Sequence, residues 1–360
     1  MVEQTPAARA RPSRTRRVVQ GAVSLLLVVA IFYFVFKRID LAQMGAEIRA
    51  MTWLELTTLG LVAVWNLATY ALVWMAVTTP RLGFGRAMVL TQSSTAVANT
   101  LPAGAAVGIG LTYAMLGSWG YSRSRSTLAV LVSGIWNSFI KLGLPVLALA
   151  LLALGGNATP ARIILAAAGI GGLAAAVVVF AAMLRSEQAA RRLGALAGRA
   201  ASRALGLVGR APVAGWEVAT TRFRARTIDL LARRWLAITA VSLVSHLSLW
   251  LVLLLALRHV GVSGAAVGWA EVLAVFAFAR LATAVPFTPG GLGVVEGVLI
   301  GGLVAAGGAT AKVAAAVVVY RALTWLLPIP VGAATYLWWR RRTWTAQVQE
   351  TPTTMRVKGS

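Results

Sequence analysis

The chain of 360 residues contains no cysteine, which excludes disulfide frameworks, thiolate nucleophiles and cysteine-based metal sites. It has only 2 histidines and 10 acidic residues, and the carboxylates do not cluster along the sequence. This set assembles neither a metal site nor a nucleophile–base pair, and the phosphate-binding pattern G-x-x-x-x-G-K-[ST] is absent. We therefore expect no enzyme: no catalytic residue, no metal, no cofactor and no direct use of ATP.

Charged residues are also scarce. They make up 12% of the chain, against about 25% in a typical soluble protein, whereas 59% is hydrophobic and the mean hydropathy is +0.78. Several apolar runs exceed the roughly 18 residues that indicate a membrane-spanning helix. The sequence thus predicts an all-α polytopic membrane protein, with spans at Val18–Phe36, Leu54–Val77, Leu128–Leu154, Ile163–Leu184, Trp235–Leu257 and Val313–Trp339.

The first apolar run begins like a signal peptide, because it follows a cluster of arginines between Arg9 and Arg17. It continues into Phe36-Lys37-Arg38 without the small-residue pattern of a cleavage site. We interpret it as a retained first helix.

The formal net charge of +24 would suggest a nucleic-acid partner in a soluble chain, so the positions of the basic residues matter. If the N-terminus is cytoplasmic, most of the 34 Lys and Arg residues fall in alternate segments on the cytoplasmic side, following the usual bias. This spread argues against a nucleic-acid partner and places both termini in the cytoplasm. The richest segment, 185–234, is either a basic amphipathic stretch on an anionic leaflet or a solvated connector.

Two further apolar regions are interrupted by proline and glycine. Residues 84–117 break at Asn99–Gly104, and residues 268–308 break at Pro286–Gly291. Each break leaves arms of about 15 residues, or about 22 Å of helix against a bilayer core of about 30 Å. Arms this short favour re-entrant hairpins that line a wet cavity, and pairs of short spans are the alternative.

The order of these elements repeats along the chain. Each half contains three spans and one hairpin, and the two hairpins enter from opposite sides of the membrane. Such an inverted repeat is typical of transporters whose binding site lies between the halves near the midplane. The predicted organisation is a basic tail (1–17), a first repeat (18–154), a second repeat (155–340) that includes the basic loop 185–234, and a C-terminal tail (341–360).

Ionisable residues within the membrane are the candidate functional groups, because burying a charge there is costly. They are Lys141, Arg280, Glu296 and Arg321, with His246 as a neutral candidate. Glu296 is expected about two turns into the second arm of its hairpin, whose free backbone N–H groups suit a phosphate. In one interpretation Arg280 and Arg321 converge there on a phosphate, and in the other they neutralise Glu296 as a buried ion pair.

Two segments carry a family resemblance. The stretch ARLATAVPFTPGGLGVVEG (279–297), followed by VVVYRALTWLLPIPVG (317–332), resembles the lysylphosphatidylglycerol synthase transmembrane family, a flippase-like domain. The resemblance covers about residues 18–340 and implies a polytopic domain of a bacterial cytoplasmic membrane that moves or binds lipids. The substrate-binding residues that we predict are Arg280, Pro289, Gly290, Gly291, Gly293, Glu296, Tyr320 and Arg321, with Pro102, Gly104, Lys141 and His246 as a second group.

The sequence departs from this family in two places. About 20 residues follow the last predicted span, too few for the aminoacyl transferase domain of some members, so lysyl-lipid synthesis is not carried over. Relatives often have Arg and Glu after the first Leu-Pro, where this chain has Ala103-Gly104-Ala105. We predict a transporter for a phospholipid or a polyprenyl-linked lipid. The alternative is a non-transporting membrane partner that presents lipid to a separate envelope-building enzyme or regulates it.

Overall fold

The computed structural model describes residues 40–101, 104–156, 160–206, 215–283 and 291–349, and the regular structure in these ranges is helical. The prediction of an all-α fold is therefore confirmed. The predicted span Val18–Phe36 lies outside the described residues. The first described helix is α2 (Leu41–Arg49), which begins after Asp40 because the Asp40 carboxylate accepts hydrogen bonds from the first backbone N–H groups.

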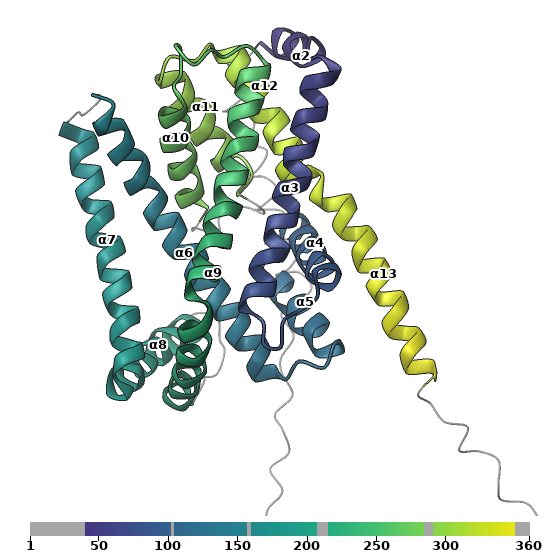
Figure 1. Cartoon of the computed structure of the whole chain (residues 1–360), viewed down its shortest axis with the longest axis vertical. Coiled ribbons are helices and arrows are strands. Elements are labelled where there is room, and N and C mark those ends of the chain that lie inside the picture. The colour runs from purple at the N-terminus through teal and green to yellow at the C-terminus, as the bar shows by residue number, and fades with distance from the viewer. Residues whose placement is uncertain (1–39, 102–103, 157–159, 207–214, 284–290, 350–360) are drawn as a thin grey trace, which may run out of the picture.

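Five helices are long and apolar enough to cross a membrane. They confirm the other five predicted spans (Figure 1): α3 (Trp53–Val77), α6 (Arg123–Leu154), α7 (Pro160–Arg185), α9 (Trp216–His259), and a final helix formed by α12 (Thr310–Arg321), a π-helical turn (Ala322–Leu326) and α13 (Pro328–Gln349).

Four shorter helices flank the two predicted breaks. They are α4 (Phe84–Thr100), α5 (Gly104–Ser118), α10 (Trp269–Ala282) and α11 (Val294–Ala305). The α4–α5 pair lies in the lower half of Figure 1 and the α10–α11 pair in the upper half. Close backbone packing holds α5 on α4, because a Cβ added at Gly104 would lie 2.5 Å from the Ala98 carbonyl oxygen, and one at Gly108 would lie 2.8 Å from the Ser94 oxygen.

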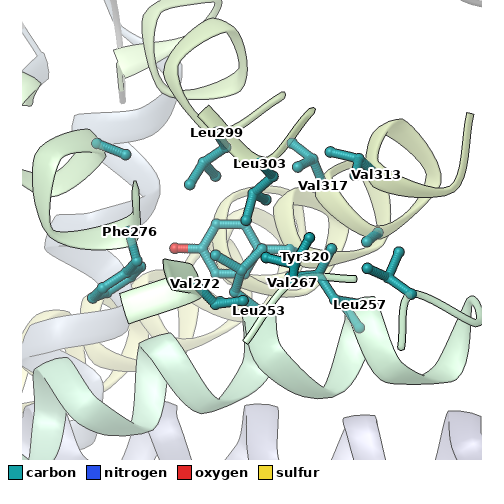
Figure 2. Close-up of a cluster of buried hydrophobic side chains, with 14 of the residues drawn as sticks. Leu253, Leu257, Val267, Val272, Phe276, Leu299, Leu303, Val313, Val317 and Tyr320 are labelled. Atoms are coloured by element: carbon teal, nitrogen blue, oxygen red, sulfur yellow. The ribbon is translucent and has the colours of Figure 1, made fainter. Parts of the chain in front are cut away.

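The largest buried cluster is built mainly from helices of the second half of the chain, with α3 and α6 contributing to it. Figure 2 shows side chains from α9, α10, α11 and α12 interlocking, among them Phe276, Leu299, Leu303 and Val317. In a membrane the surrounding lipid is as apolar as these side chains, so the helices are held by close packing rather than by exclusion of water. This cluster fixes the ends of α10, α11 and α12, where the candidate charged residues lie.

The basic segment between α7 and the last part of α9 forms a helical hairpin. Helix α8 (Glu187–Gly206) lies against the start of α9, and two of its glycines make the contact close. A Cβ added at Gly194 would lie 2.6 Å from Thr220 Oγ1, and one added at Gly198 would lie 3.0 Å from Trp216. Helix α9 thus begins well before the predicted Trp235, because the arginine- and alanine-rich residues that precede it favour a helix. Further along α9, Arg234 Nη1 donates to the Thr78 carbonyl oxygen at 2.8 Å, satisfying a backbone acceptor just past the end of α3.

Candidate functional site

The turn before α11 positions Glu296. Gly291 (φ 70°) and Gly293 (φ 80°) adopt left-handed backbone conformations that favour glycine, and α11 begins directly afterwards at Val294. Glu296 is therefore in the first turn of its helix, and the prediction that it lies about two turns into the arm was wrong. The reason is that the glycine turn delays the start of the helix to Val294.

The Glu296 carboxylate is buried and has two partners. Its Oε2 atom accepts a hydrogen bond of 2.7 Å from the Gly293 backbone N–H, and its Oε1 atom accepts one of 2.6 Å from Arg321 Nε. The side chains of Glu296 and Arg321 are 4% and 14% exposed, so this ion pair is shielded from solvent. Of the two interpretations of these charges, the structure contains the ion pair, and the carboxylate itself caps the start of α11.

A π-helical turn follows Arg321 directly. Its Leu327 N–H donates to the Ala322 carbonyl oxygen, and the next residue, Pro328, has no N–H with which to bond the Thr324 carbonyl. The turn places the Trp325 ring 5.6 Å from the Arg321 guanidinium. Asn99, at the end of α4, donates to the Trp325 carbonyl oxygen at 3.1 Å. The first interrupted region thus contacts the final helix one turn after Arg321, beside the Glu296–Arg321 pair.

Lys141 and Arg280 form a second group of charges at the inner end of α10. Lys141 Nζ donates to Thr283 Oγ1 at 3.0 Å, and Thr283 Oγ1 donates to the Arg280 carbonyl oxygen at 2.6 Å. The Arg280 charge is close enough to act electrostatically on Lys141, His246 and Tyr320. Arg280 Nε is buried without a hydrogen-bond partner. In the part of the chain that the structure describes, neither cation forms a salt bridge.

His246 lies on the neighbouring helix α9, in a polar environment. Its Nδ1 atom is 2.9 Å from the Ser242 carbonyl oxygen. Because a carbonyl oxygen only accepts, Nδ1 carries the proton of this hydrogen bond. The other ring nitrogen, Nε2, is buried without a partner among the described residues.

The remaining predicted residues have packing roles or lie outside the described residues. Tyr320 is 3% exposed and its ring lies among the apolar side chains of α9, α10 and α11 (Figure 2), so it is a core residue. Gly104 lies in the contact between α4 and α5. Pro102, Pro289 and Gly290 fall outside the described residues.

Sequence reasoning missed three residues at this site, namely Asn99, Thr283 and Trp325. Asn99 and Thr283 are uncharged residues at helix ends beside a break, and a search for polar residues at those positions would have found them. Trp325 lies in the π-helical turn of the final helix, and no sequence signal that we used marks it.

Comparison with known proteins adds one finding. The model of the family described as "Lysylphosphatidylglycerol synthase TM region" matches residues 21–332, which is most of the chain. No curated protein matches it.

Proposed function

The chain belongs to the lysylphosphatidylglycerol synthase TM region family, and on this premise we propose that it binds an anionic lipid within the membrane and passes it between the leaflets. Multi-pass membrane location follows from the family and from the five apolar helices. The lipid is the proposal, and its support lies in the charges near the inner ends of the short helices.

The observation that carries the proposal is the pair of cations Lys141 and Arg280. Lys141 lies in α6, a candidate membrane span, Arg280 lies near the inner end of α10, and neither forms a salt bridge in the described part of the chain. Placing two like charges close together in a medium of low dielectric constant is unfavourable unless an anion compensates them. A lipid phosphate supplies that anion, with oxygens that accept from Nζ and from the guanidinium.

The start of α11 is the less suitable place for the phosphate. The Glu296 carboxylate already accepts the Gly293 N–H there and neutralises Arg321. A phosphate at the same position would meet that negative charge. We therefore assign the phosphate to Lys141 and Arg280, and a supporting role to the Glu296–Arg321 pair.

Our proposal also includes an arrangement of the chain in the membrane. In it, α4–α5 and α10–α11 are re-entrant hairpins of two inverted halves, with α8 and the C-terminal end of α13 on the cytoplasmic side. The two short pairs lie in opposite halves of the molecule in Figure 1, and in this arrangement their inner ends face the junction between the halves. Sites at such a meeting point are common in transporters built from inverted repeats.

Native mass spectrometry of gently extracted protein tests the lipid assignment. We expect a co-purifying anionic lipid in the wild type. Each charge-assisted hydrogen bond contributes about 1.5–3 kcal/mol, so Arg280→Gln or Lys141→Gln should weaken lipid binding by about tenfold or more and lower the occupancy of the extracted protein. The matched control is Arg49→Gln, which removes an exposed cation from α2. Unchanged occupancy in the Lys141→Gln, Arg280→Gln double variant would overturn the assignment.

A further inference from the structure

An apolar groove of about 620 Å³ lies beside α6, between this helix and α5, α7 and α8. Apart from Gly134 and Ser138, every residue that lines it is apolar. Phe139 and Phe180 form one wall, with their ring centroids 5.6 Å apart. Because α6 and α7 are candidate membrane spans, the natural surroundings of this groove are lipid acyl chains.

A second cavity of about 220 Å³ lies on an adjacent face of α6, against α3 and α9, and both polar and apolar residues line it. Its hydrogen-bonding residues are Tyr70, Ser133, Asn137, Ser242, Ser245 and His246. Two of their buried atoms, Ser245 Oγ and His246 Nε2, have no partner among the described residues. Two residues of the cavity wall, Ser245 and His246, thus carry a hydroxyl group and an acceptor nitrogen that lack a hydrogen-bond partner among the described residues.

Gly134 lines both the groove and the cavity. A Cβ built on Gly134 meets no atom within 4 Å, so this glycine leaves open space where the two meet. Asn137 of the polar cavity lies one helical turn before Lys141 on the same face of α6. In order around α6, the apolar groove comes first, then the cavity that shares Gly134 with it, and Lys141 lies one turn beyond Asn137 on the cavity's face.

From this order we infer that Gly134 marks a lateral binding site for one amphipathic lipid. An acyl chain occupies the groove, and a hydroxyl-bearing part of the head group occupies the polar cavity and bonds His246 Nε2. The inference rests on the proposed function in taking a lipid as the ligand and in placing its phosphate near Lys141. An amphiphile fits both spaces, whereas a purely apolar occupant would leave the buried polar atoms of the cavity unsatisfied.

Substitution at Gly134 tests the position of this site. Gly134→Trp fills the space where groove and cavity meet, and Gly171→Trp is the matched control, since Gly171 is an exposed glycine of α7 that also has nothing within 4 Å. The probe is phosphatidylglycerol with a fluorescent acyl chain, titrated against the purified protein in detergent. We expect binding about tenfold or more weaker in Gly134→Trp and unchanged in Gly171→Trp. Equal binding by both variants would overturn the site.

A thermal unfolding scan shows whether the variants are folded. If Gly134→Trp does not fold, the smaller Gly134→Val takes its place, with Gly171→Val as its control. If Gly134→Trp instead changes the oligomeric state and leaves lipid binding intact, the groove is a contact between copies of the chain, and the lipid site is wrong. Arg280→Gln separates this inference from the proposed function. If Arg280→Gln weakens lipid binding and Gly134→Trp does not, the phosphate site is supported and the lateral site is rejected.

Substitution at His246 tests recognition of the head group. His246→Phe removes the acceptor nitrogen and keeps a ring of similar size. We expect it to weaken the binding of phosphatidylglycerol several-fold and to leave the binding of phosphatidic acid unchanged, because phosphatidic acid lacks the head-group hydroxyls. Equal loss for both lipids, or no loss for either, would overturn the hydroxyl assignment.

Discussion

A buried carboxylate such as Glu296 is stable only when its charge is compensated and its oxygens accept hydrogen bonds. Arg321 and the Gly293 N–H provide both. The energetic consequence is asymmetric, because removing one partner of a buried pair costs more than removing both. The pair therefore has a structural role that mutation can separate from ligand binding.

At the residue scale we predict that Arg321→Gln destabilises the protein by about 3–5 kcal/mol, because it leaves the buried Glu296 carboxylate without its cation. The double variant Glu296→Gln, Arg321→Gln should recover much of that loss. Equilibrium unfolding in detergent of both single variants and the double variant measures the coupling. An Arg321→Gln protein of wild-type stability that no longer binds anionic lipid would contradict this assignment.

The sequence located the charged residues of this site but not their partners. Intramembrane charge is a strong signal because it is costly, so Lys141, Arg280, Glu296 and Arg321 were identified before the structure. Their pairing depends on how α6, α10, α11 and α12 pack, and Lys141 and Thr283 are 142 positions apart in sequence. The sequence alone therefore fits both hypotheses for Glu296, and its contacts with Gly293 and Arg321 distinguish them.

At the element scale, the prediction was least complete for the basic segment after α7. Composition alone left it as either a connector or an amphipathic stretch, and its described residues form α8 and the first part of α9. The apolar spans were predictable because their length and hydropathy are local properties of the sequence. The contact of Gly194 with Thr220 and of Gly198 with Trp216 is not local, so the helical hairpin was not predictable.

The sidedness of α8 follows from its arginines, which the proposed arrangement places in the cytoplasm. Because the chain has no cysteine, single cysteines report sidedness without background labelling. We predict that Ala200→Cys, at an exposed position of α8, reacts with an impermeant thiol reagent only from the cytoplasmic side. The control Ala265→Cys, exposed between α9 and α10, should react only from the opposite side. Labelling of both from one side would contradict the arrangement.

At the scale of the whole molecule, the structure gathers Lys141, Arg280, Glu296 and Arg321 near the inner ends of short helices. Long helices surround these ends, and α4 is joined to the π-helical turn through Asn99. An anionic lipid that reaches Lys141 and Arg280 would contact α6 and the inner end of α10, and in the proposed arrangement the α10–α11 and α4–α5 pairs belong to opposite halves. Relative movement of these pairs would then expose the head group to one side of the membrane or the other.

Leaflet exchange in reconstituted vesicles tests this account most directly. Fluorescent phosphatidylglycerol is placed in both leaflets, and an impermeant quencher reports the fraction that becomes accessible over time. The account predicts faster exchange with the wild-type protein than in protein-free vesicles, and a rate near the protein-free value with the Lys141→Gln, Arg280→Gln double variant. Exchange at the protein-free rate with wild-type protein that still binds the lipid would contradict transport and favour the role of a lipid-presenting partner.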